Sequence, residues 1–150
     1  PEIYNKTAIY PMQVTLQRSP DGLAMIGADQ SGNELRIALP EIAGGDYTGL
    51  RPMQLMILSL GGCSAVDVLS ILKKQRQEVN DMRIEIDAER FQKPLPNPWE
   101  KAHLVFTISG RVDQSKAEKA VEMSINKYCS ASETLRLAGA TITWEVKVSG

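Results

Sequence analysis

The stretch that decides the fold is Pro52-Met-Gln-Leu-Met-Ile-Leu-Ser-Leu-Gly-Gly-Cys-Ser-Ala-Val-Asp-Val-Leu-Ser-Ile-Leu72. Proline suits the first position of a helix, and the run from Met53 to Gln77 is apolar nearly all round until it turns polar at Lys73. A helix that is hydrophobic on all sides is buried on all sides. Because one small sheet cannot cover such a helix, the sequence predicts a second layer or a partner subunit around it.

Two features inside this run indicate its surroundings. Gly61 and Gly62 each cost about 1 kcal/mol relative to alanine, which predicts the close approach of another backbone. Asp67 is ionisable and would be costly in the middle of a membrane span. We therefore expect a buried helix of a protein that does not cross a membrane.

Strands joined by turns are predicted on both sides of this helix. The sequences Ser19-Pro-Asp-Gly22 and Asp29-Gln-Ser-Gly32 favour turns, and a hairpin meander is the simplest interpretation of the first third. After the central helix, two strands precede two helices, with Ser130 as the predicted N-cap of the second, and a final strand. The predicted strands span residues 10–16, 23–28, 34–39, 82–91, 103–112 and 142–148. Because strands and helices do not alternate regularly, the fold class is α+β with a mainly antiparallel sheet.

Length and composition restrict the function. A chain of 150 residues is predicted to form one domain over residues 1–150. With 17 basic and 18 acidic residues the net charge is −1, which argues against a nucleic-acid partner. The sequence has no stretch resembling a signal peptide, and two cysteines without one predict the reducing cytoplasm.

The sequence lacks the motifs that are typical of metal-binding, cofactor-binding and hydrolytic sites. One histidine, two separated cysteines and no CxxC predict neither a metal site nor a bound cofactor. Cys63 and Asp67 are four residues apart on the predicted helix, but a third ligand is not evident. There is no Walker loop, GxGxxG or GxSxG motif, and His103 is expected on a surface or an interface.

Thiol chemistry therefore depends on Cys63 and Cys129, the only cysteines. The alternative is that both are inert, small buried hydrophobes. Helix N-termini and cations lower the pKa of a thiol. Cys129 precedes Ser130-Ala-Ser-Glu133, which is typical of a helix start, whereas Cys63 lies in mid-helix. On local grounds Cys129 is the better activated thiol, and Cys63 needs a cation brought to it by the fold.

Three motifs together resemble the OsmC/Ohr family. The segment from Arg51 to Cys63 is similar to the family's central-helix motif. A second family motif is matched by Arg36-Ile-Ala-Leu-Pro40 followed by Gly44-Gly45. A third family motif is matched by Tyr128-Cys129-Ser130 before a short helix. The resemblance covers essentially the whole chain, and the run from Gly61 to Leu72 resembles a YhfA-like branch most.

The resemblance implies an OsmC-like fold in which sheets wrap around a long buried central helix in an intertwined homodimer. It also implies a thiol peroxidase that reduces organic hydroperoxides in oxidative-stress defence. Cys63 would be the peroxidatic cysteine that becomes a sulfenic acid, which reverses the order expected on local grounds. Cys129 would be the resolving cysteine that forms a disulfide with it, and an external dithiol would reset the pair.

The sequence also departs from the family pattern. Met53 stands where family peroxidases carry a glutamate that holds an arginine close to the reactive thiol. Arg18 is the nearest positional match for that arginine, and Arg51 is the other candidate cation. Asp67 could accept a hydrogen bond or pair with a cation, and Met53 could line a pocket for an apolar substrate. The alternative function is therefore a non-catalytic, redox-responsive or small apolar ligand-binding protein on the same scaffold.

Overall fold

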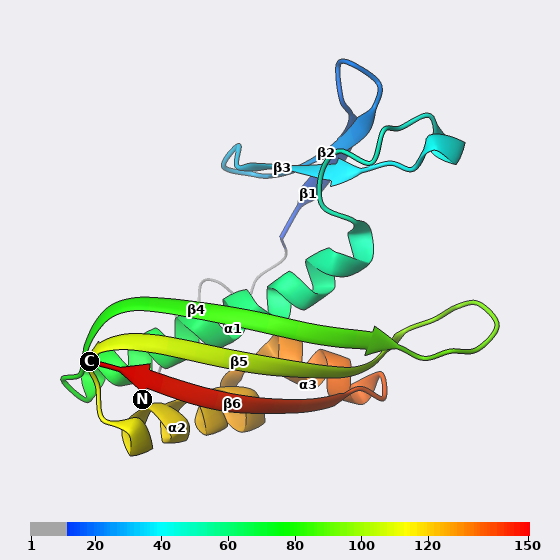
Figure 1. Ribbon diagram of the computed structural model, residues 1–150. Coiled ribbons are helices and arrows are strands. Elements are labelled where there is room, and N and C mark those ends of the chain that lie inside the picture. The colour runs from blue at the N-terminus through cyan, green and yellow to red at the C-terminus, as the bar shows by residue number, and fades with distance from the viewer. Residues whose placement is uncertain (1–11) are drawn as a thin grey trace. The chain divides into compact units, whose positions relative to one another are not determined.

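The computed structural model describes residues 12–150, which form two compact units (Figure 1). The first unit ends at Met56, and the second runs from Ile57 to Gly150. Helix α1 (Pro52–Lys74) begins in the first unit and continues in the second, close to the predicted bounds. The single domain over residues 1–150 stays a prediction.

The first unit contains the predicted meander. Strands β1 (Val14–Arg18), β2 (Ala24–Asp29) and β3 (Glu34–Ala38) form an antiparallel sheet in that order. Gly22 and Gly32, with φ of 75° and 87°, take the left-handed conformation that the two turns require. A short 3₁₀ helix, η2 (Glu41–Ala43), follows the sheet. Residues 10 and 11 of the first predicted strand lie outside the described residues.

The second unit is a three-stranded sheet covered on one face by helices (Figure 1). Strands β4 (Glu78–Arg90) and β5 (Trp99–Arg111) pair antiparallel, and β6 (Thr141–Ser149) pairs parallel to β5. Parallel neighbours require a crossover connection. Here the crossover consists of α2 (Gln114–Met123), the π-helical turn η3 (Ser124–Tyr128) and α3 (Ser130–Leu137). The predicted helix over 114–128 is thus an α-helix that ends in a π turn.

The core of the second unit lies between the sheet and the helices. Every second residue of β5 is buried, as the alternation in the sequence predicts. Gly61 of α1 faces β4, and a Cβ there would come within 2.9 Å of Ile86 Cδ1. The close neighbour of Gly61 is thus a side chain and not the backbone that the sequence predicts. The largest fully buried apolar side chains are Leu60, Val68, Leu72, Leu104, Phe106, Ile108, Val121 and Ile125.

The opposite face of α1 remains exposed in the single chain. Leu58, Val66 and Leu69 have exposed fractions of 51%, 51% and 42%. Gly62 belongs to the same stripe, and a Cβ there would meet nothing within 4 Å. By length and hydropathy α1 is long and apolar enough to cross a membrane, but its other face carries the core residues of the second unit. The helix is therefore buried on one side and not on all sides within one chain.

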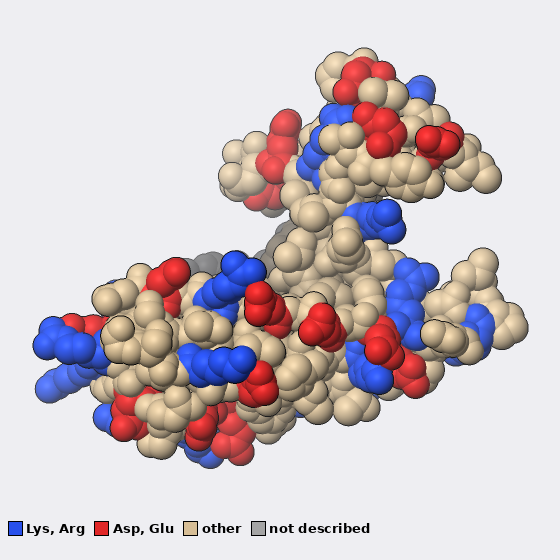
Figure 2. Space-filling view, viewed as in Figure 1, with Lys and Arg blue, Asp and Glu red and all other residues tan. Residues whose placement is uncertain are grey.

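Acidic and basic side chains are interspersed on the face of the second unit shown in Figure 2. Several form ion pairs between exposed partners on or beside the sheet, including Lys101 with Glu89 at 3.1 Å and Lys147 with Glu145 at 3.5 Å. His103 belongs to this outer surface, as expected, and its Nδ1 lies 2.7 Å from Thr143 Oγ1. Exposed pairs of this kind contribute little to stability, so the core side chains carry the fold.

We predict that Gly110→Ala destabilises the protein by about 2 kcal/mol or more. Gly110 has φ of 129°, and a Cβ there would lie 2.1 Å from the carbonyl oxygen of Glu78 at the bulge between β4 and β5. Urea unfolding followed by circular dichroism measures the loss. The control is Ser109→Ala on the same strand, for which we expect less than about 1 kcal/mol. Equal stability of the Gly110 variant and the wild type would contradict the strain argument.

Candidate functional site

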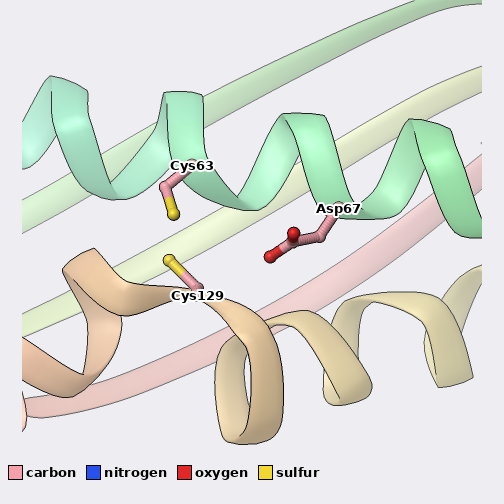
Figure 3. A group of neighbouring side chains, drawn as sticks. All are labelled: Cys63, Asp67 and Cys129. Atoms are coloured by element: carbon pink, nitrogen blue, oxygen red, sulfur yellow. The ribbon is translucent and has the colours of Figure 1, made fainter. Parts of the chain in front are cut away.

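Three side chains that can carry chemistry meet inside the second unit (Figure 3). Cys63 and Asp67 extend from α1, and Cys129 lies opposite them at the start of α3. The two Sγ atoms and a carboxylate oxygen of Asp67 all lie within 4.8 Å of one another. Asp67 and Cys129 are buried, whereas Cys63 is half-buried. The structure thus brings together three of the six residues predicted for the site.

The spacing of residues on α1 places both apolar and polar side chains on the face of the helix that points into the core. Residues three or four apart share a helix face, so Leu60, Ser64 and Asp67 line the same side of α1. All three are completely buried. The inner face of the helix is therefore mostly apolar but carries polar groups at the level of Cys129.

The carboxylate of Asp67 is held by a serine from the crossover. Ser124 Oγ donates a hydrogen bond of 2.8 Å to Asp67 Oδ2, and Ser124 is itself completely buried. A buried polar group requires such a partner, because its desolvation is otherwise uncompensated. Ser124 is the first residue of the π turn η3, and π turns are frequent at functional sites.

Cys129, and not Ser130, is the N-cap of α3. Its backbone is extended, with φ of −74° and ψ of 106°, and its Sγ accepts a hydrogen bond of 3.3 Å from the amide of Ser132. Ser64 Oγ of α1 donates to the same sulfur at 3.6 Å. The predicted cap at Ser130 is wrong by one residue, because the thiol itself occupies the capping position.

Burial raises the pKa of the Cys129 thiol from its ordinary value of 9.0 to about 11. The hydrogen bonds from Ser132 and Ser64 lower the pKa, and the neighbouring thiol of Cys63 raises it further. The exposed fraction of Cys129 is only 3%, so water cannot stabilise a thiolate there. The expected lowering of the Cys129 pKa by the helix start is therefore not found, because burial outweighs the helix N-terminus.

The other three predicted site residues belong to the first unit. Arg18 ends β1, and its Nε donates to the carbonyl oxygen of Gly22 at 3.2 Å. The guanidinium of Arg51 lies 5.7 Å from the centre of the Tyr47 ring, and both side chains are exposed. Met53 is half-buried in the first turn of α1. The roles of these three residues toward Cys63 stay predictions.

Sequence reasoning missed the serines that surround the sulfurs. Ser64, Ser124 and Ser132 are completely buried, and each makes a hydrogen bond to a site residue. Ser124 could have been found, because it follows Ala117, Ala120 and Val121 on the apolar stripe of its helix. A serine in such a stripe indicates a buried polar partner.

A cavity opens beside Cys129. Its volume is about 240 Å³, and residues 125–130 together with Glu133 line it. Lys127, Tyr128 and Glu133 give this lining both charged and aromatic character. The cavity thus adjoins the buried Cys129, and the second cysteine of the site, Cys63, is half-buried.

Comparison with known proteins places the chain in a family. Residues 44–145 match the OsmC-like protein family. Protein YhfA of Escherichia coli strain K12 is 34% identical over 128 residues, which cover 84% of this chain and 92% of that protein.

Solved structures share the fold. A hypothetical protein from Aquifex aeolicus VF5 superimposes with a TM-score of 0.77 and 32% identity, covering 95% of this chain and all of that one. OsmC of Legionella pneumophila, described as an organic hydroperoxide resistance protein, superimposes with a TM-score of 0.64 and 19% identity over 95% of this chain and 98% of its own. The α+β architecture predicted from the sequence is confirmed, and the chain belongs to the OsmC-like protein family.

Proposed function

We propose that this protein is a thiol-dependent peroxidase that reduces organic hydroperoxides and serves in oxidative-stress defence. The observation that carries the proposal is the pair of sulfurs, Cys63 Sγ and Cys129 Sγ, within 4.8 Å of each other. Membership of the OsmC-like family supports it, as does the fold shared with a hydroperoxide resistance protein of Legionella pneumophila.

The reaction needs no cofactor. The Cys63 thiolate attacks the terminal peroxide oxygen, the O–O bond breaks, and the alkoxide takes a proton to leave as an alcohol. The sulfenic acid formed on Cys63 then condenses with the Cys129 thiol, which forms the disulfide and releases water. An external dithiol reduces the disulfide and is itself oxidised, which restores both thiols. We place this cycle in the cytoplasm, where such dithiols are available.

The two positions suit two different roles. Cys63 is half-buried and thus more exposed than Cys129, whereas the buried Cys129 has a pKa raised to about 11 and is largely protonated at neutral pH. A protonated thiol is a poor attacking group. It can nevertheless react once a sulfenic acid forms beside it, because the two sulfurs lie within 4.8 Å of each other and need to close to about 2.0 Å to form the disulfide. These properties support Cys63 as the attacking cysteine and Cys129 as the resolving cysteine.

We propose that the active form is a homodimer. Leu58, Gly62, Val66 and Leu69 form one apolar stripe, which we call the outer stripe of α1, because successive members are three or four residues apart. Gly62 in the middle of the stripe would let a second helix approach closely. Packing of two such stripes against each other would remove the exposed apolar surface from water.

We predict that Cys63 is alkylated much faster than Cys129. At pH 8, iodoacetamide should modify Cys63 at least about tenfold faster, because Cys129 is buried and its thiol is held protonated. Mass spectrometry of peptides from a timed reaction measures both rates. The rate at Cys129 should rise up to a pH of about 11, its own pKa. Equal rates in the folded protein at pH 8 would contradict the assignment of roles.

We predict that one equivalent of cumene hydroperoxide removes two thiols per chain from the reduced protein. Cys63→Ser should abolish peroxide consumption, because no other accessible thiol exists. Cys129→Ser should stop at a sulfenic acid that dimedone traps, and its turnover with dithiothreitol should fall at least about tenfold. Thiol titration and a peroxide assay provide the measurements.

Ser130→Ala is the matched control, since it alters a hydroxyl beside Cys129 and leaves both sulfurs in place. If Cys63→Ser consumes peroxide as fast as the wild type, the peroxidase proposal fails. If the wild type shows no turnover, the non-catalytic alternative gains support. Arg18→Ala and Arg51→Ala in the same assay show whether either cation activates Cys63.

We predict that Val66→Glu converts the dimer to a monomer at micromolar concentration. The charge would lie within the outer stripe, where its desolvation opposes packing. Lys74→Glu adds the same side chain about 80° further around the helix than Val66 and should leave the dimer intact. Sedimentation equilibrium distinguishes the two masses, and a monomeric wild type would refute the proposed assembly.

A further inference from the structure

We propose that Cys63, Asp67 and Cys129 of the reduced protein form a binding site for one thiophilic divalent cation, of which Zn²⁺ is the best match. The sequence showed two of these ligands on one helix, and the fold places Cys129 beside them as the third. The inference does not rest on the peroxidase proposal, because binding requires only that both thiols are reduced.

The donor atoms fit zinc in kind and number. Zinc takes thiolate sulfur and carboxylate oxygen, and sites with three protein ligands keep a fourth position for water. Zn–S bonds of about 2.3 Å and Zn–O bonds of about 2.0 Å place tetrahedral ligands roughly 3.5–3.8 Å apart. The three ligand atoms already lie within 4.8 Å of one another. Approaches of about 1 Å between the ligand atoms would therefore bring them to the spacing of a tetrahedral zinc site.

The elements that carry the ligands hold them in place. Cys63 and Asp67 are one turn apart on α1, the spacing at which paired ligands on a helix bind one zinc ion. Cys129 is fixed independently, because it caps α3 and its Sγ accepts the amide of Ser132 at 3.3 Å. Such pre-positioning lowers the entropic cost of assembling the site.

Outer partners orient two of the three ligands. Ser124 Oγ donates to Asp67 Oδ2 at 2.8 Å, and Ser64 Oγ lies 3.6 Å from Cys129 Sγ. Hydrogen bonds of this kind fix the ligand geometry of metal sites and commonly change affinity by about 10–100-fold. Besides compensating for the burial of these groups, Ser64 and Ser124 would act as the outer partners of the metal ligands.

The burial of the cluster also favours a cation. Asp67 and Cys129 have exposed fractions of 0% and 3%, so anionic ligands there receive little stabilisation from water. A divalent ion would supply two positive charges at the point where the ligands converge. Cys63 is only half-buried, and a cavity of about 240 Å³ adjoins Cys129.

The experiment uses the reduced, chelator-treated full chain without peroxide. We expect one Zn²⁺ per chain, measured by competition with a chromophoric chelator. Co²⁺ in place of Zn²⁺ should give a thiolate charge-transfer band in the near ultraviolet and strong visible bands typical of four-coordination. Bound zinc should also slow alkylation of Cys63 at least about tenfold, because the metal occupies its sulfur.

Variants assign the ligands. Cys63→Ser and Cys129→Ser should each weaken zinc binding by about 100-fold or more, Asp67→Asn by about tenfold or more, and Ser124→Ala by about tenfold. Asp81→Asn, which alters an exposed carboxylate on β4, is the control and should bind as the wild type does. Circular dichroism checks that each variant is folded.

Several outcomes would overturn the inference. Zinc binding that is unchanged in the folded Cys63→Ser or Asp67→Asn variants would exclude this ligand set. A Co²⁺ complex of the wild type that lacks a thiolate band would also exclude this ligand set, and this result needs no variant. A chain that binds zinc but reduces no peroxide refutes only the peroxidase proposal, whereas one that turns over peroxide and binds no zinc refutes only this one.

Discussion

Burial of the inner face of α1 is the constraint on which the second unit depends. This face carries Leu60 and Val68 into the core, but it also carries Asp67. A carboxylate can be buried there only if hydrogen-bond donors are built beside it. Ser124 meets that need from the π turn, so the hydrogen bond fixes the crossover segment against α1 at this level. Cys129 follows five residues later and is thereby placed opposite Cys63.

Much of this architecture could be predicted from the sequence, because it follows local periodicity. Alternation in β5 and the apolar run of α1 are properties of single segments, and both elements lie near their predicted bounds. The parallel pairing of β5 with β6 was not predicted, because it depends on how the crossover returns to the sheet. The need for glycine at position 110 was missed for the same reason, since a Cβ there would meet the carbonyl oxygen of Glu78 on another strand.

In the site, too, the sequence identifies individual residues, whereas their arrangement depends on the tertiary structure. The residues Cys63, Asp67 and Cys129 were each found from the sequence, and the family resemblance implied that the two cysteines meet, but the convergence of all three within 4.8 Å was not predicted. A helix start lowers the pKa of a thiol, and Cys129 lies at one. Its pKa is raised nevertheless, because the position is buried and desolvation of the thiolate outweighs the amide of Ser132. Only the packing of the crossover against α1 reveals which of the two effects dominates.

The two proposed uses of the sulfurs, peroxide reduction and zinc binding, both require a positive charge close to thiolates that lie near Asp67. A guanidinium leaves both sulfurs free to react, whereas a metal ion occupies them. A disulfide between Cys63 and Cys129 removes two of the three metal ligands, so oxidation and metal binding exclude each other at this site.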